Sequence, residues 1–296
     1  MNTIPAKTIL TPKKDNSWFG IDYNMNLYKG CCHGCIYCDS RSDCYGVTDF
    51  DTVRAKEHAI ELIEKELRSK SKSGVIGTGA MSDPYNPFER EYQLTRHALS
   101  LIHQYQFGIG IATKSDLVAR DIDLLQNIKS HSPVICKITV TTSDDLLSAK
   151  LEPGTSVSSK RLAAVKQLSQ AGIFTGILLM PVLPFLEDTE LNILGIIQSA
   201  YESGARFIYP NFGVTLRQNQ RDWFYQKLDY LFPEQRIKQL YQSQFKDSYV
   251  CTSPKARELW LLFQKKCDQL GILYRMKDII KAYKEKYQYE QLRLFY

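Results

Sequence analysis

The chain has 296 residues, of which 44% are hydrophobic and 24% are charged, so it can form one large core or one core with a small appendage. No apolar run is long enough to span a bilayer and the N-terminal segment is polar, so we expect a cytoplasmic protein that has no membrane contact. The net charge of +6 favours anionic partners such as nucleic acid, although acidic and basic residues are intermixed.

Helical stretches and short apolar runs alternate over the first two thirds of the chain, a pattern typical of βαβ units and a mainly parallel sheet. We predict strands at 23–28, 75–76, 108–113, 134–141, 173–180 and 206–209. We predict helices at 53–67, 89–105, 119–129 and 189–203, and a further helix that Ser158 caps and Gly172 closes. Six strands joined by helices indicate an α/β fold, an open partial (β/α)6 TIM-like barrel.

The strand pattern stops near residue 218, and two amphipathic helices are predicted around 221–231 and 254–270. We therefore expect a barrel core over residues 1–217 and a C-terminal helical extension over 218–296 that packs on it as a cap. Basic and aromatic residues mix in the first part of this extension, where they serve either nucleic acid binding or a packed helix with a solvated basic face.

Three cysteines crowd into the loop that follows the first predicted strand, at Cys31, Cys35 and Cys38. Thiolates with this C-x3-C-x2-C spacing can hold three corners of a cubane iron–sulfur cluster and leave the fourth iron open to a non-protein ligand. A zinc site completed by His33 or Cys32 is the weaker alternative, because zinc normally takes four ligands and no second cysteine or histidine pair is present. A plain structural role for the triad is the third reading.

With this triad, and with Tyr37 directly before the last cysteine, the sequence resembles the radical S-adenosylmethionine (SAM) superfamily. The resemblance implies a [4Fe-4S] cluster on the three cysteines, SAM at the open iron, and a one-electron reductant of the flavodoxin or ferredoxin type. It also implies reductive cleavage of SAM to a 5'-deoxyadenosyl radical that abstracts hydrogen from a substrate.

The resemblance is closer to the spore photoproduct lyase-like subgroup. The segments that carry it are 26–30, 82–87 with Glu89, 113–115 with 120–121, 152–153, and 214–217 with 220–221. The subgroup implies Ser82 and Asp83 near the SAM amine, Lys114 at the SAM carboxylate, Tyr37 against the cluster or adenine, and Thr139, Thr141 and Glu152 near the ribose or amine. Ordinary turn, strand and surface roles are the competing interpretations.

Two positions depart from the lyase pattern. Ala80 stands where the lyase has its hydrogen-donating cysteine, and Asp39 stands where it has a tyrosine after the last cluster cysteine. Without that thiol we do not expect thymine-dimer repair, and Tyr37 or Cys32 becomes the candidate catalytic hydrogen donor, with Cys44 as a further thiol.

The C-terminal tail resembles the peptide by which bacterial repair and replication proteins bind the sliding clamp, through Gln291, Leu292, Leu294 and Phe295. Packing of these apolar residues on the barrel is the alternative. For the whole chain, hydrogen abstraction from nucleic acid, as in a DNA repair lyase, is the first hypothesis. The alternatives are a radical SAM modifier of a protein or small molecule, and a non-enzymatic iron–sulfur or zinc module.

Overall fold

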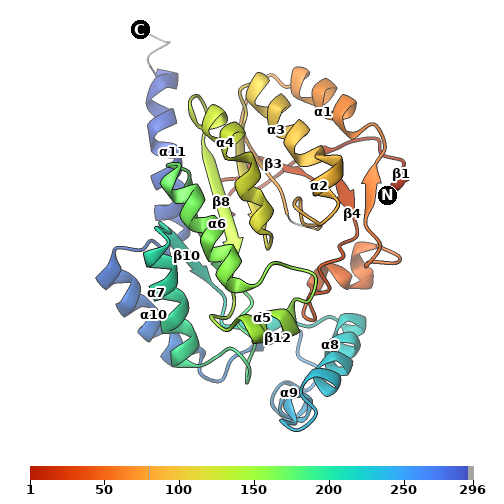
Figure 1. Cartoon of the computed structure of the whole chain (residues 1–296), viewed down its shortest axis with the longest axis vertical. Coiled ribbons are helices and arrows are strands. Elements are labelled where there is room, and N and C mark those ends of the chain that lie inside the picture. Colours follow the sequence, from red (N-terminus) through yellow and green to blue (C-terminus); the bar gives the residue numbers. More distant parts are fainter. Residues whose placement is uncertain (80, 293–296) are drawn as a thin grey trace.

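A computed structural model describes residues 1–79 and 81–292 and is built around one seven-stranded sheet with the strand order β10-β9-β8-β7-β6-β3-β2 (Figure 1). All neighbouring pairs are parallel except β2 and β3, which are antiparallel. The strands are β2 (Leu10–Pro12), β3 (Tyr23–Met25), β6 (Val75–Gly77), β7 (Gly108–Thr113), β8 (Val134–Thr139), β9 (Phe174–Leu179) and β10 (Phe207–Pro210). The predicted α/β partial barrel is therefore confirmed.

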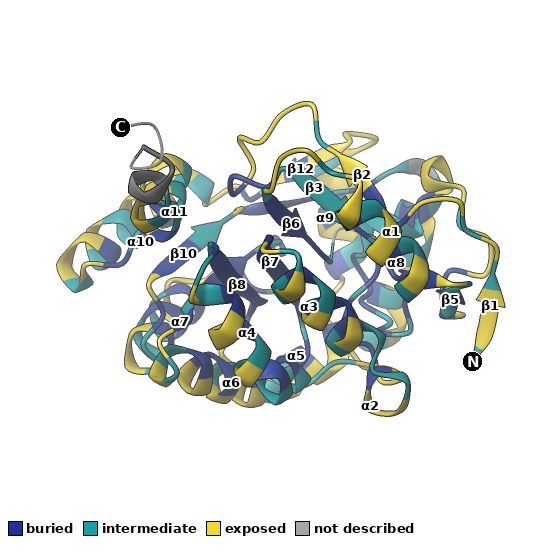
Figure 2. Cartoon of the chain, turned by 90° about the horizontal axis from the view of Figure 1, so that it is seen from above, coloured by how far each residue is buried: buried dark blue, intermediate teal, exposed yellow. Residues whose placement is uncertain are grey.

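Helices connect the parallel strands and cover the outside of the sheet, as Figure 2 shows from above. They are α1 (Ala59–Arg68), α3 (Leu94–Gln104), α4 (Ile122–Lys129), α6 (Ser158–Gln170) and α7 (Glu190–Glu202), with the short α2 (Glu89–Tyr92) and α5 (Asp145–Leu151) between them. Because the strands are parallel, these crossovers bring their carboxyl ends to one side of the sheet, where ligands of α/β sheets bind.

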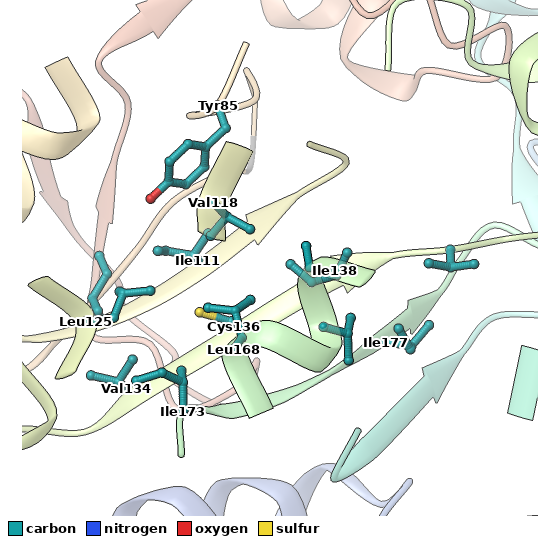
Figure 3. Packing of buried hydrophobic residues seen from close by; sticks show 14 of the residues in the cluster. Tyr85, Ile111, Val118, Leu125, Val134, Cys136, Ile138, Leu168, Ile173 and Ile177 are labelled. Atoms are coloured by element: carbon teal, nitrogen blue, oxygen red, sulfur yellow. The ribbon is translucent and has the colours of Figure 1, made fainter. Parts of the chain in front are cut away.

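The outer face of the sheet forms the main core. Ile111, Cys136, Ile138 and Ile177 alternate with inward-facing residues and pack fully buried against the helices, as Figure 3 shows. The inner face is different, because β6 and β7 place Gly77, Gly110 and Ala112 there. Small residues on this face leave room inside the barrel.

Local deviations from the predicted elements have physical causes. The strand predicted at 23–28 ends at Met25, and β4 (Tyr28–Lys29) pairs with β5 (Arg54–Lys56) and not with the main sheet. This second sheet also contains β1 (Asn2–Ile4), so the helix predicted from residue 53 begins only at Ala59. The apolar spacing did not distinguish a short strand from the first turn of a helix.

Two further helices differ at their starts. Gln93 adopts a positive φ of 51°, which divides the predicted helix 89–105 into α2 and α3. A 3-10 turn, η3 (Asp116–Asp121), takes up the start of the helix predicted from residue 119. The predicted Ser158 cap is wrong, because Ser158 is the first helical residue and its hydroxyl has no hydrogen-bond partner among the described residues.

The C-terminal part is richer than the two predicted helices. It contains α8 (Gln218–Leu231), α9 (Ile237–Phe245), α10 (Ala256–Leu270) and α11 (Met276–Leu292). Strand β12 (Val250–Thr252) pairs with β11 (Gly213–Thr215), which corrects the expectation that strands stop near residue 218. Leu273 extends the main sheet beside β10, where backbone hydrogen bonds join Ile208 to Leu273 and Leu273 to Arg206.

Helix α11 closes the barrel at the amino-terminal ends of the parallel strands. Ile279 and Tyr283 pack with Phe19 and Ile21 inside it, and the Tyr283 hydroxyl donates a 2.6 Å hydrogen bond to the Phe19 carbonyl. Leu294 and Phe295 of the predicted clamp-binding tail lie outside the described residues, as do the side chains of Gln291 and Leu292. Over the described residues, no helix combines the length and apolar character needed to cross a bilayer.

Candidate functional site

A cavity of about 480 Å³ opens at the carboxyl ends of the parallel strands. Cys31, Cys35 and Cys38 all line it. The three thiols predicted to act together therefore face one common space, in the size range of cofactor and substrate pockets. Among the described residues, no three His, Cys, Asp or Glu side chains gather closely enough to hold a single metal ion.

Residues 31–38, which contain the three cysteines, form a segment that we call the cluster loop. It is held in place mainly by its backbone. Gly30 precedes it with a φ of +81°, and a Cβ at this position would lie 2.3 Å from the Thr52 carbonyl oxygen, so only glycine fits. The N–H of Cys31 donates to the Phe50 carbonyl (2.8 Å), and the N–H of Ile36 donates to the Leu151 carbonyl (3.0 Å). The thiols thus project from a loop that is fixed at both ends.

The loop after β6 connects this segment to the next strand. The Ser82 hydroxyl donates to the Gly30 carbonyl at 2.6 Å. The Asp83 carboxylate accepts hydrogen bonds from the Thr113 hydroxyl (2.6 Å) and the Lys114 N–H (2.8 Å), and it lies 3.5 Å from the His33 imidazole. Asp83 therefore connects the loop after β6 with the end of β7 and with His33 of the cluster loop. These contacts use much of the capacity of its carboxylate to accept hydrogen bonds.

Lys114 projects into the cavity from the end of β7. Its ammonium lies 5.7 Å from the centre of the Tyr37 ring and has no hydrogen bond or ion pair within the described part of the chain. Burial by itself lowers the pKa of Lys114, but the charges of Cys35 and Glu152 outweigh burial and raise it. The side chain is thus a cation that can bind an anionic ligand.

A buried ion pair lies behind the cluster loop. Arg161 of α6 and Glu152 are both buried and paired, and the Tyr37 hydroxyl donates to the same carboxylate. Burial raises the pKa of Glu152, but the Arg161 and Lys114 charges outweigh that effect and lower it. The sequence pattern pointed to Glu152 but missed Arg161, which is far along the chain from the cysteines.

Five of the residues predicted to bind cofactor line the cavity together with the cysteines: Tyr37, Ser82, Asp83, Lys114 and Thr139. The other predicted residues do not line it. The Thr141 carbonyl accepts a hydrogen bond from Asn192, Glu152 pairs with Arg161, and Cys32 packs against the main core. Burial raises the pKa of Cys32 to about 11, so this thiol is held neutral. Ala80 lies outside the described residues.

Several lining residues escaped the sequence analysis, including Trp18, Met81 and Lys137, and His33 was considered there only as a zinc ligand. Trp18 and Lys137 carry no motif, and their position follows only from the way β8 and the N-terminal segment meet inside the barrel. The sequence offers one hint for Lys137, a single lysine in a strand whose other residues are mostly apolar, but this hint does not reveal what the side chain contacts.

Some motif residues prove to be structural. Glu89 is buried, and its carboxylate accepts a hydrogen bond from the Tyr28 hydroxyl. The same carboxylate lies 3.2 Å from the Arg120 guanidinium. Arg120 also pairs with buried Asp121 at 2.8 Å. These contacts hold the helix α2 segment against η3, outside the cavity.

The motif at the start of α8 joins the C-terminal extension to the cluster loop. Gln220 donates to the Tyr37 carbonyl at 3.0 Å, and Arg217 lies 3.1 Å from Asp39, in the 3-10 turn η1 (Asp39–Arg41) next to Cys38. Phe224 and Leu228 of the same helix pack in one apolar cluster with Ile36 and Tyr37. The extension therefore supports the site directly.

Residues 25–194 match the family model of the radical SAM superfamily, which spans more than half of the chain. The chain belongs to the radical SAM superfamily. Members of this superfamily use a [4Fe-4S] cluster and SAM, and they need a one-electron reductant. Cluster, SAM and enzymatic activity, all expected from the sequence, are thereby confirmed at the level of the family.

Similar proteins include an uncharacterized protein of Mycobacterium tuberculosis, 31% identical over 229 residues, which cover 74% of this chain and 67% of the other. An uncharacterized protein of Methanocaldococcus jannaschii is 34% identical over 193 residues, which cover 64% of this chain and 70% of the other. This radical SAM protein therefore has relatives in two distant organisms, and both related proteins are named as uncharacterized.

Solved structures of spore photoproduct lyase share the fold of this radical SAM protein. The complex with a dinucleoside spore photoproduct has a TM-score of 0.65 at 17% identity and covers 90% of this chain and 78% of the lyase. The radical SAM methyltransferase TsrM from Kitasatospora setae, with a tryptophan substrate bound, has a TM-score of 0.52 at 12% identity, covering 83% and 51%. The predicted likeness to the lyase subgroup is confirmed as a likeness of fold.

Proposed function

We propose that Cys31, Cys35 and Cys38 hold the [4Fe-4S] cluster of the family and that SAM binds beside it in the cavity. One observation carries this proposal: the three thiols share the cavity with Lys114, whose ammonium has no partner within the described residues. Three thiolates and one open iron are what a SAM-binding cluster requires.

When bound, the cluster supplies the electron that cleaves SAM to a 5'-deoxyadenosyl radical, which abstracts hydrogen from the substrate. The protein has to orient SAM and exclude water. Lys114 binds the SAM carboxylate, while Ser82 and Asp83 fix the loop that receives the amine. Leu178, Met180 and Val214 give the rest of the cavity an apolar wall that protects a radical.

We infer that the substrate is a nucleic acid, a substrate class supported by three observations. The net charge is +6. The Arg41 guanidinium of η1 lies 3.9 Å from the centre of the Trp223 ring of α8, and the Lys227 ammonium of α8 lies 4.4 Å from the same centre. Cations combined with aromatic rings are the usual composition of surfaces that bind single strands. A lyase of the same fold binds a dinucleoside.

Thymine-dimer repair is not part of the proposal. Asp39 occupies the position of the lyase tyrosine and pairs with Arg217, so no hydrogen donor stands there. Tyr37 is the remaining candidate donor in the cavity, and its hydroxyl is held by Glu152. A flavodoxin or ferredoxin is the proposed reductant.

The binding half of the proposal can be tested by anaerobic reconstitution with iron and sulfide. We expect about four irons per chain and saturable SAM binding. Cys35→Ala should lose the cluster, and Lys114→Met should keep the iron but bind SAM at least tenfold more weakly. Cys44→Ala is the matched control, because Cys44 is exposed outside the triad. Stoichiometric zinc in place of iron, or a cluster that does not bind SAM, would support the non-enzymatic module instead.

A further inference from the structure

Lys137 lies on the inner face of β8, inside the barrel. The alternation of β8 points Ile135, Lys137 and Thr139 inward, while Cys136 and Ile138 pack on the outer face. Lys137 lines the same cavity as the three cysteines and Lys114. Because Lys137 precedes Thr139 by two residues, it lies about 7 Å deeper along the strand.

The Lys137 side chain is 3% exposed. Its ammonium lies 5.1 Å from the centre of the Phe19 ring, and it has no hydrogen bond or ion pair among residues 1–79 and 81–292. Ile21 and Leu178, which line the same part of the cavity, are apolar. A buried charge without a partner is costly, so this lysine needs an explanation beyond packing.

No carboxylate in the described chain compensates for this charge. The acidic residues lining the cavity are Asp39, which pairs with Arg217, and Asp83, which accepts from Thr113 and Lys114. Burial, with a smaller contribution from the Lys13 charge, lowers the pKa of Lys137 to about 8, although Cys136 acts in the opposite direction. The deep part of the cavity is therefore electropositive and lacks a counter-charge.

The backbone of β7 comes close to the Lys137 ammonium at Gly110. A Cβ added at Gly110 of β7 would lie 2.4 Å from the Ile21 side chain and 3.3 Å from the Lys137 ammonium. A larger residue at this position would collide with the Ile21 side chain and crowd the ammonium, so glycine is required by the close approach. Lys137 is thus almost completely buried and still lines the cavity.

We propose that Lys137 binds an anionic group of the substrate, a carboxylate or a phosphate, at the deep end of the cavity. The inference rests on the proposed function, in which the substrate enters this cavity. Lys114 at the strand ends binds SAM, and Lys137 below it recognises the substrate. Lys137 would then select substrates that carry a negative charge, and the bound anion would supply the missing counter-charge.

The test measures the reactivity of Lys137 in the reconstituted protein with SAM bound. Trace labelling with acetic anhydride, followed by mass spectrometry, gives the acetylation rate of each lysine with inorganic phosphate, acetate or chloride at constant ionic strength. We expect phosphate or acetate to slow acetylation of Lys137 at least fivefold with a saturable dependence. Exposed Lys166 on α6 is the internal control and should react equally in all three salts. Whichever of the two anions protects better identifies the group.

A second measurement compares thermal stabilisation by the same anions in wild type, Lys137→Met and Lys166→Met. Methionine has a similar length and buries no charge, so Lys137→Met should fold. We expect its stabilisation by the protecting anion to disappear, while Lys166→Met keeps it. Equal stabilisation of Lys137→Met, or an acetylation rate that neither anion changes, would overturn the proposal.

Two other outcomes would also overturn it. If Lys137 does not react with acetic anhydride even in chloride, its ammonium is closed off from the cavity. If Lys137→Met loses as much SAM affinity as Lys114→Met, Lys137 binds SAM and not the substrate. SAM cleavage is assayed on the same preparation. If SAM is not cleaved, the proposed function fails while the anion data still stand, and if SAM is cleaved without anion protection, only the role of Lys137 fails.

Discussion

At the scale of single residues, the site depends on charges that are buried and compensated. Glu152 and Arg161 are both fully buried, and each is the main partner of the other. Such a pair contributes little net stability compared with apolar residues, but removal of one member leaves an uncompensated charge. The pair therefore holds the Tyr37 hydroxyl in place, and loss of either member is expected to destabilise the fold strongly.

Arg161→Met should leave the buried Glu152 without its ion-pair partner and lower the free energy of unfolding by about 3–5 kcal/mol. Urea unfolding monitored by circular dichroism measures this loss. The control is Lys160→Met at the neighbouring exposed position, for which we expect a change within about 0.5 kcal/mol. Equal midpoints for the two variants would show that the ion pair is not structurally important.

Glu187 is a second buried carboxyl, whose Oε2 accepts from the Leu183 N–H at 2.9 Å. Burial raises its pKa from 4.5 to about 8. Between these values the unfolded chain ionises Glu187 while the folded chain keeps it protonated, so its contribution to stability falls as pH rises.

Glu187→Gln removes this dependence. We expect little change in Tm at pH 4.5, a gain of several degrees at pH 8, and no further gain at higher pH. Thermal unfolding from pH 4.5 to 9 tests the prediction. A gain that is the same at every pH would mean that the pKa of Glu187 is close to its ordinary value.

At the scale of elements, backbone geometry sets the shape of the loop after β6. Gly79 has a φ of +82°, and a Cβ there would lie 2.1 Å from the Ala112 carbonyl oxygen of β7. Gly271, at the end of α10, has a similar φ of +67° but open space around its Cβ position. Alanine at residue 271 would therefore cost only backbone strain, whereas alanine at residue 79 would add a steric clash with β7.

Gly79→Ala should destabilise the protein by roughly 2–4 kcal/mol, because the β6 loop must move as well as adopt a strained φ. Gly271→Ala should cost only about 1 kcal/mol. Denaturant midpoints of the two variants give the comparison. If the two losses are equal, the approach of Gly79 to β7 has no energetic importance.

The alternation of apolar runs and helical stretches was enough to predict the six parallel strands and the helices between them, because that pattern follows from burial on both faces of the sheet. Element starts were less predictable. Val53 fits a helical spacing, yet Arg54–Lys56 pair with Tyr28–Lys29, a contact between distant segments that local sequence does not encode. Strand β12 was missed for the same reason, since it exists only by pairing with β11.

The candidate site was predictable where spacing determines chemistry. The cysteine triad and the residues at strand ends, such as Lys114, were found because parallel strands bring their carboxyl ends together. Arg161 and Lys137 were not found, because their roles depend on which side chains meet inside the fold.

At the scale of the whole molecule, the C-terminal extension places Trp223 and Lys227 of α8 beside Arg41, which follows the three cysteines. Lys227→Met on this surface should weaken binding of single-stranded DNA and reduce the slope of log affinity against log salt by about one. Fluorescence anisotropy at several salt concentrations measures both quantities, with Lys166→Met as the control. Absent or salt-independent binding in the wild type would favour a protein or small-molecule substrate.

We propose that the three cysteines and the cavity around them form a SAM-cleaving centre. The most direct measurement is the yield of 5'-deoxyadenosine after anaerobic reconstitution, reduction with dithionite and addition of SAM, in wild type, Cys35→Ala and Cys44→Ala. We predict that wild type and Cys44→Ala form 5'-deoxyadenosine and that Cys35→Ala forms none above background. Equal yields from Cys35→Ala, or no product from a wild type with a full cluster, would contradict the claim.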